Sequence, residues 1–286
     1  MKVFTVLILF FLCFFNISCT HQDGLVGAEP IAKSTNLFSA HPDLIYGADP
    51  VQQSLDLFLP AKSNRNTTGV IIFIHGGGWT TGVKDDFNNL GMDTFFTQRN
   101  YAVITMNYRL VNKYPYPNAL DDIDLVLNYI QANADKWNIN ANKICLFGRS
   151  SGAHLALQYA YTRNISNRIK AVVDCFGPVD FTRHDVVNGQ LGELVAQMLG
   201  PYIYNEALWH DASPINHLSG AVPTAIMQGS ADSLVYASQS VALQDSLLAR
   251  GIPSIYLTWA GNGHGWNQGR WIESREVVAA WLKQYL

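Results

Sequence analysis

Charged residues are scarce in this 286-residue sequence, because Asp, Glu, Lys and Arg together account for only 14% of it. The 19 basic residues are outnumbered by 22 acidic ones, and no cluster of Lys and Arg is present. The chain therefore has no positive surface for a phosphate backbone, which argues against nucleic acid as a partner. With 48% hydrophobic and 12% aromatic residues, it also lacks the composition of a disordered protein and predicts a substantial core.

Cysteine is also rare. The four cysteines show no paired C-x-x-C spacing, so the sequence predicts neither a zinc site nor a disulfide framework. Cys145 and Cys175 lie inside apolar runs, where we expect buried free thiols. No apolar run reaches the roughly 18–20 residues that a helix needs to cross a bilayer. What remains is a compact globular protein for which we expect no metal ion.

The N-terminal segment has the pattern of an export signal. Lys2 precedes an almost unbroken apolar run over residues 3–15, as in secretory signal peptides. The run is followed by Asn-Ile-Ser-Cys19, which resembles a bacterial lipoprotein box, although that pattern prefers Leu at the first position. We expect a signal peptide over residues 1–18, a lipid on Cys19 and a polar tether over 19–42. The protein is then exported, either as a cell-envelope lipoprotein tethered to a membrane or, after ordinary signal cleavage, as a secreted protein.

Short apolar runs alternate with helical patterns over the rest of the chain. Several runs are apolar throughout, which suits parallel strands buried on both faces: 70–74, 102–106, 143–147, 171–173, 224–227 and 254–257. Helical patterns occupy 119–132, 153–161, 235–248 and 274–285. By contrast, residues 54–59 alternate polar and apolar, which predicts an antiparallel edge strand.

This alternation predicts an α/β fold, with a doubly wound, mostly parallel sheet of about eight strands. We place it in one domain over residues 43–286. Residues 181–220 break the rhythm, because they are rich in Gly, Pro, Tyr and Trp and contain no clear strand. An insertion of this length predicts a small cap or binding loop.

A serine nucleophile is predicted at Ser150. The sequence Gly148-Arg149-Ser150-Ser151-Gly152 directly follows an expected strand and opens an expected helix. A serine on such a tight strand-to-helix turn has a strained backbone and an exposed Oγ. Glycines two residues to either side are needed because a Cβ would clash where the helix crosses the strand.

An oxyanion-binding loop is predicted at His75-Gly76-Gly77-Gly78-Trp79, at the carboxyl end of an earlier strand. Consecutive glycines allow backbone N–H groups to turn inward and stabilise an oxyanion. We expect Gly77, Gly78 and Ser151 to supply the donors. His75 is interpreted as an anchor of the loop, because its strand is the wrong place for a base.

The general base must reach Ser150 from a loop after the last strand, and His264 stands there between glycines. For the acid that orients this histidine, Asp232 follows the strand over 224–227. Asp180 follows the preceding strand and is the alternative.

The motifs resemble α/β-hydrolases of the H-G-G-G esterase branch, close to the bacterial feruloyl and acetyl-xylan esterase-like (BD-FAE-like) group. Matching stretches span most of residues 44–286 and include 55–60, 75–79, 107–110, 148–155, 212–215 and His264. The sequence departs from the family at Arg149, where an acidic residue is common, and at 151–153, where Ser-Gly-Ala replaces Ala-Gly-Gly.

The resemblance implies a serine carboxylic-ester hydrolase that acts through an acyl-enzyme and needs no cofactor. Its expected partner is a small-molecule or carbohydrate ester with an acetyl, feruloyl or other short acyl group, and Trp79 and Trp266 are candidates for substrate contacts. An amidase or peptidase that uses the same three residues, similar to arylformamidases, is one alternative. A non-catalytic binding protein on the same fold is another, and it predicts loss of one of these groups, yet all are present.

Overall fold

A computed structural model of the chain describes residues 38–87 and 90–286, within one compact unit that spans Asn36–Leu286. The predicted signal peptide, the lipidation site at Cys19 and most of the predicted tether lie outside the described residues. Within the described ranges, no helix is long and apolar enough to span a bilayer.

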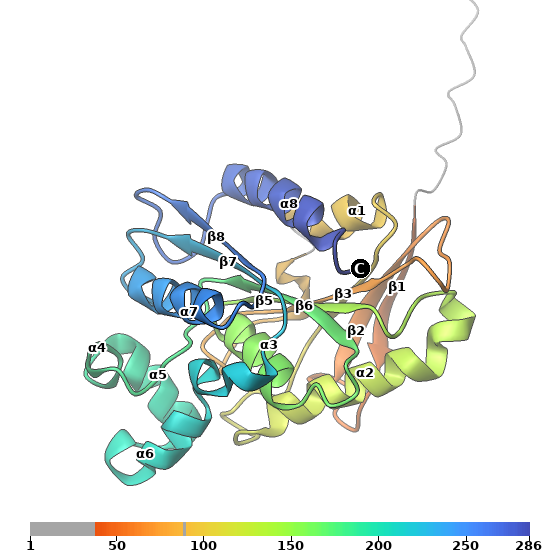
Figure 1. Cartoon of the computed structure of the whole chain (residues 1–286). Helices are drawn as coiled ribbons and strands as arrows, with labels where there is room; N and C mark the ends of the chain where they lie inside the picture. The colour runs from red at the N-terminus through yellow and green to blue at the C-terminus, as the bar shows by residue number, and fades with distance from the viewer. Residues whose placement is uncertain (1–37, 88–89) are drawn as a thin grey trace, which may run out of the picture. The chain divides into compact units, whose positions relative to one another are not determined.

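Eight strands form one sheet in the order β1-β2-β4-β3-β5-β6-β7-β8 (Figure 1). β1 pairs with β2 and β2 with β4 in antiparallel fashion, and the other neighbours are parallel. Their bounds are β1 (Phe38–Ile45), β2 (Ser54–Pro60), β3 (Val70–Ile74), β4 (Ala102–Met106), β5 (Ile144–Arg149), β6 (Ile169–Cys175), β7 (Thr224–Gly229) and β8 (Ser254–Trp259). The predicted fold class is therefore confirmed.

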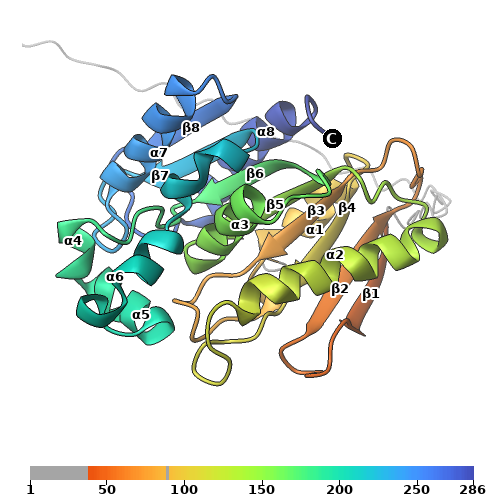
Figure 2. The same ribbon diagram turned by 60° about the horizontal axis from the view of Figure 1, so that its bottom comes forward.

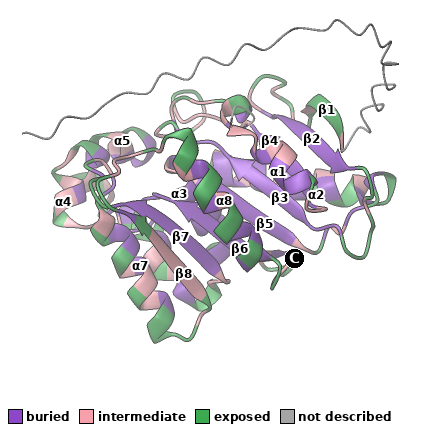
Figure 3. Ribbon diagram, turned by 90° about the horizontal axis from the view of Figure 1, so that it is seen from above, coloured by how far each residue is buried: buried purple, intermediate pink, exposed green. Residues whose placement is uncertain are grey.

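Helices cover both faces of this sheet (Figures 1 and 2). One face carries α2 (Asn118–Trp137), α3 (Ser151–Thr162) and α7 (Ala237–Ala249), and the other carries α1 (Met92–Thr97) and α8 (Gln268–Leu282). The sheet therefore has a first hydrophobic core under α2, α3 and α7 and a second hydrophobic core under α1 and α8. Successive side chains of a strand point to opposite faces, so Ile72 of β3 packs into the first core and Phe73 into the second. Because both faces are covered, the central strands are buried along their length, as Figure 3 shows.

The first strand corrects two predictions. β1 begins at Phe38, inside the tether expected over residues 19–42 and before the expected domain start at residue 43. It pairs along β2, so β2 is fully buried and is not the edge strand that its pattern suggested. Most of β1 is exposed, with polar Ser39 and His41 among its residues. An exposed edge strand has no apolar run that would reveal it in the sequence.

The insertion predicted over residues 181–220 is helical. It contains α4 (His184–Val187), α5 (Gln190–Leu199), α6 (Tyr202–Asp211) and the 3₁₀ segment η3 (Pro214–Gly220). Figure 2 shows α4, α5 and α6 beyond one end of the sheet. Trp209 fastens this insertion, because its buried ring packs edge-on against Phe181 and Tyr202 while its Nε1 donates to Gly200 O at 2.9 Å.

β6 carries a carboxyl group inside the core. Asp174 is fully buried, and its Oδ1 accepts a hydrogen bond of 2.7 Å from Gly177 N, which closes the turn after the strand. Its Oδ2 has no hydrogen-bond partner among the described residues. Burial raises the pKa of Asp174 to about 7, and the hydrogen bond from Gly177 offsets this only in part. The group is therefore expected to titrate near neutrality in the folded protein.

We predict that Asp174 makes the protein less stable as the pH rises from about 4 to about 7. The folded-state pKa is above the ordinary value of 3.8, so the favourable contribution of the protonated group is complete below that value and is lost as the pH passes through 7. The variant Asp174→Asn keeps an acceptor for Gly177 but cannot ionise. Thermal unfolding of both proteins across this range should show the Tm of the variant rising relative to wild type up to pH 7 and levelling off above it. A Tm difference that is the same at pH 4 and pH 8 would contradict the prediction.

Candidate active site

The turn between β5 and α3 holds Ser150 in a strained conformation. Its φ of 54° and ψ of −122° lie in a region that non-glycine residues rarely adopt, and this lifts the side chain off the end of the sheet. The turn depends on a close approach of α3 to β3. A Cβ on Gly152 would lie 2.2 Å from Ile74 O and 2.4 Å from His75 O, so only glycine fits there. The strand, turn and helix expected around Ser150 are all present.

Ser150, His264 and Asp232 form a continuous hydrogen-bonded chain. The Oγ of Ser150 lies 2.8 Å from Nε2 of His264, and Nδ1 of His264 lies 2.8 Å from Oδ2 of Asp232. The three residues follow β5, β8 and β7, whose carboxyl ends meet at one edge of the sheet. The structure thus brings together the three residues that the sequence singled out. Asp180, the alternative acid, instead accepts hydrogen bonds from the backbone N and the hydroxyl of Thr182.

Asp232 is held in its ionised form although it is buried. Burial by itself would raise its pKa, but the hydrogen bond and charge of His264, with N–H donors from the following loop, outweigh burial and keep the pKa below its usual value. Those donors are Leu234 N at 3.0 Å and Val235 N at 2.9 Å, both to Oδ1. An ionised carboxylate can only accept a hydrogen bond, so Nδ1 of His264 carries the hydrogen and Nε2 is left free to accept a hydrogen bond from Ser150.

The glycine loop after β3 lies beside Ser150. Gly77 has a φ of +117°, and a Cβ there would lie 2.2 Å from Thr81 O, so the loop conformation requires glycine. Gly77 and Gly78 line the same cavity as Ser150 and His264. None of the hydrogen bonds formed between described residues uses the N–H of Gly77, Gly78 or Ser151. These three donors are available beside the nucleophile, as an oxyanion hole requires.

His75 secures this loop from below. Its ring is buried and stacks on Tyr108 at a centroid distance of 4.2 Å, and the hydroxyl of Tyr108 donates to His75 O at 3.1 Å. Burial lowers the pKa of His75 to about 4, so the ring is neutral at pH 7. Nδ1 of this ring lies 2.7 Å from Gly76 O. His75 therefore fixes the loop and takes no part in proton transfer.

A cavity of about 520 Å³ opens over Ser150 and His264. Phe176, Leu194 and Leu234 give it apolar surface, and Thr80, Thr81 and Arg149 give it polar surface. The sequence did not indicate any of these six residues as a substrate contact, apart from the fact that Arg149 directly precedes Ser150. Leu194 belongs to α5 of the insertion, and no spacing in the sequence indicates which side of that helix faces the cavity.

The structure does not place Trp79 or Trp266, the two candidates for substrate contacts, in the lining of the cavity. Trp79 has a φ of 61° and its ring is turned into the core, where Nε1 donates to Nδ1 of His154 at 3.2 Å. Trp266 packs among Phe176 and other aromatic rings of the second core. Neither residue lines the cavity. Proximity in sequence to Gly78 and to His264 does not determine the direction of a side chain.

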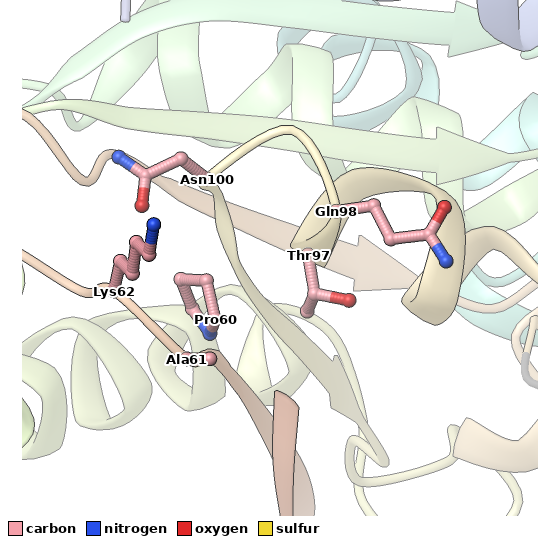
Figure 4. A pocket seen from close by; sticks show the side chains of 6 residues that line it. All are labelled: Pro60, Ala61, Lys62, Thr97, Gln98 and Asn100. Carbon is pink, nitrogen blue, oxygen red and sulfur yellow. The ribbon is translucent and has the colours of Figure 1, made fainter. Parts of the chain in front are cut away.

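A second cavity, of about 570 Å³, lies at the other end of the parallel strands, away from their carboxyl ends. Figure 4 shows the residues that line it. It adjoins the end of β2 and the segment before β4, and is lined by Pro60, Ala61, Lys62, Thr97, Gln98 and Asn100. It holds none of the candidate catalytic residues. No group of three or more His, Cys, Asp or Glu in residues 38–87 and 90–286 is arranged to hold a metal ion.

Solved structures share this fold. A truncated carbohydrate esterase from gut microbiota superposes with a TM-score of 0.76 at 23% identity, covering 88% of this chain and 98% of that one. An acetyl ester-xyloside bifunctional hydrolase from Caldicellulosiruptor lactoaceticus gives a TM-score of 0.69 at 20% identity, covering 86% and 96%. Both likenesses establish the α/β-hydrolase fold.

Sequence comparison adds the family. The chain is 29% identical over 195 residues to a probable carboxylic ester hydrolase, LipM, of Mycobacterium tuberculosis, which covers 63% of this chain and 45% of that protein. The chain spans about half the length of the curated relatives it matches. The BD-FAE family model matches residues 55–247, which include Ser150, Asp232 and the glycine loop. The chain therefore belongs to the BD-FAE family of α/β-hydrolases.

Proposed function

We propose that the protein is a serine carboxylic-ester hydrolase that acts through an acyl-enzyme. The observation that carries the proposal is the chain of two 2.8 Å hydrogen bonds that joins Ser150, His264 and Asp232. The N–H groups of the adjacent glycine loop are available beside these three residues to stabilise an oxyanion. The name of the relative LipM supports the same reaction class.

In the proposed reaction, Ser150 Oγ attacks the ester carbonyl while Nε2 of His264 takes its proton. The negative charge on the carbonyl oxygen is stabilised by the N–H groups of Gly77, Gly78 and Ser151, each of which typically contributes about 10²–10³-fold to the rate. His264, now positively charged and held by Asp232, gives the proton to the leaving alcohol. Water then attacks the acyl-enzyme by the same route, and no cofactor takes part.

The substrate we propose is a short-chain acyl ester or a carbohydrate-linked acyl ester, in which the acyl group is acetyl or feruloyl. The cavity supports this because its apolar residues suit an acyl chain, whereas the hydroxyls of Thr80 and Thr81 and the guanidinium of Arg149 suit a hydroxyl-rich alcohol. Arg149 is paired with Asp86 at 3.2 Å through one of its nitrogens and retains further N–H donors. The names of the two structural neighbours, a carbohydrate esterase and an acetyl ester-xyloside bifunctional hydrolase, agree with this choice.

Hydrolysis of p-nitrophenyl esters from acetate to octanoate, of acetylated xylan and of methyl ferulate tests the proposed reaction. Wild type should release the alcohol, and Ser150→Ala should lose at least about 10³-fold in kcat while remaining folded, because no other group can form the acyl-enzyme. A matched anilide series distinguishes an amidase. If wild type cleaves the anilides faster than the esters, the reaction is amide hydrolysis, and if it cleaves neither, the esterase proposal fails.

Leu194 is expected to limit the length of the acyl chain. Its Cδ2 atom lies 3.3 Å from where a Cβ on Gly78 would be, so the side chain stands directly over the oxyanion loop. In Leu194→Ala, the kcat/KM for hexanoate relative to acetate should rise about 10-fold, because the truncated side chain gives longer acyl groups apolar space. Leu191→Ala on the same helix is the control, since Leu191 is buried in the core and does not line the cavity. An unchanged ratio in Leu194→Ala would place the acyl group elsewhere.

We also propose that the protein is exported and carries a lipid on Cys19. The support is Lys2 and the apolar run over residues 3–15, followed by the lipoprotein-like box at Asn-Ile-Ser-Cys19. Labelling with radioactive palmitate in a bacterium that processes lipoproteins should mark wild type and Cys13→Ser, and should fail in Cys19→Ser. Labelling of Cys19→Ser as strong as that of Cys13→Ser would place the lipid on another residue, and no labelling of wild type would leave ordinary signal cleavage as the mode of export.

A further inference from the structure

The carboxylate of Asp232 has a second side-chain partner on the oxygen that faces His264. Oδ2 accepts a hydrogen bond of 3.0 Å from Nε2 of Gln228, in addition to the bond from His264. Gln228 lies in β7, four residues before the aspartate, and is fully buried. Both acceptor directions of Oδ2 are therefore occupied, one by the imidazole and one by a neutral amide.

The surroundings of Gln228 determine which way its amide points. Nε2 also lies 3.0 Å from Val235 O and 3.2 Å from Gly229 O, so all three of its neighbours are acceptors. On the other side, Oε1 accepts a hydrogen bond of 3.0 Å from the hydroxyl of Ser240, a buried residue of α7. A reversed amide would place its oxygen against two carbonyls and a carboxylate, which electrostatics forbids.

We propose that Gln228, oriented by Ser240, is a positioning residue that directs Oδ2 of Asp232 toward His264. The proposal rests on the proposed hydrolase and extends its hydrogen-bonded chain by two residues, from Ser150 through His264 and Asp232 to Gln228 and Ser240. The backbone N–H groups of Leu234 and Val235 hold only Oδ1. The amide of Gln228 adds a restraint on Oδ2 itself, and without it His264 is the one described donor that remains on that oxygen, so the alignment of Oδ2 with Nδ1 becomes less well defined.

A glutamine suits this place because it donates without carrying a charge. A positively charged donor would compete with His264 for the carboxylate and weaken its hold on the imidazolium that forms during the reaction. A donor fixed by Ser240 at its far end also loses no further freedom when the reaction proceeds, so the carboxylate is oriented before substrate binds. Gln228 acts through Asp232 and touches no reacting atom.

Gln228→Met tests the proposal, because methionine fills a similar volume and cannot donate. We expect kcat for p-nitrophenyl acetate to fall about 10- to 100-fold with KM within about twofold of wild type, as for loss of a hydrogen bond to a charged group. The matched control is Gln239→Met. Gln239 is equally buried and makes three hydrogen bonds, but they go to the backbone of residues 179 and 180. The variant Gln239→Met should lower the Tm and leave kcat unchanged.

A second readout does not depend on turnover. In the substrate-free protein, the downfield proton resonance of His264 Nδ1 reports its hydrogen bond to Asp232. It should be preserved in Gln239→Met and shifted or broadened in Gln228→Met. If the resonance of wild type is changed by Gln228→Met but not by Gln239→Met, and wild type hydrolyses no ester, the positioning role stands and the proposed reaction fails. An unchanged resonance together with an unchanged kcat in Gln228→Met overturns the positioning role and leaves the hydrolase intact.

Ser240 provides the test if Gln228→Met does not fold. Ser240→Ala removes only the hydrogen bond to Oε1 of Gln228, so kcat should fall about threefold and the His264 resonance should broaden. Ser240→Thr restores a hydroxyl and should restore both. Ser240→Ala with wild-type kcat and resonance would contradict an orienting role for this pair.

Discussion

The approach of α3 to the end of β3 is the contact on which the site depends. Gly152 allows the helix backbone to come within contact distance of the carbonyls of Ile74 and His75, the last residues before the glycine loop. This proximity places the N-terminus of α3 and the N–H groups of the loop around one point, where Ser150 stands. A side chain at residue 152 would push α3 away from the end of β3. Ser150 and the N–H groups of the loop could then no longer reach the carbonyl group of one substrate molecule together. The other contacts of the site act on residues that the contact between α3 and β3 has already brought together.

Two buried aspartates show how their surroundings decide the state of a carboxyl group. Asp232 receives four hydrogen bonds and faces an imidazole, and its pKa is lowered in spite of burial. Asp174, on the neighbouring strand, receives one hydrogen bond from a described residue, and burial raises its pKa to about 7. Asp174 lies within β6, and Asp232 lies in the loop that follows the neighbouring strand β7. The difference lies in the groups around Asp232, because His264 lowers its pKa most and the backbone N–H groups of Val235 and Leu234 add to that effect.

The sequence predicted the parts of the molecule that follow from short-range rules. The parallel strands had apolar runs because both faces of the sheet are covered, and the elbow around Ser150 had glycines because the backbones touch. Strand β1 escaped prediction, since an exposed edge strand needs no apolar pattern. The direction of Trp79 also escaped it, because a positive φ at that residue turns the ring into the core. Leu194 is brought to the site by tertiary packing, and no local signal in the sequence marks it. Gln228 lies only four residues before Asp232, but the sequence does not show that its amide contacts the carboxylate.

The chemistry and the specificity of the site are thus built by different parts of the chain. Ser150, Gln228 and Asp232 lie on or shortly after the buried strands β5 and β7, and His264 lies in the loop after the edge strand β8. The wall of the cavity includes Leu194, which is carried by α5 of the insertion. Substitutions in that helix can change the shape of the cavity without disturbing the sheet. A change behind Asp232, by contrast, alters the rate for every substrate, because each acyl group depends on the same proton transfer between Ser150 and His264.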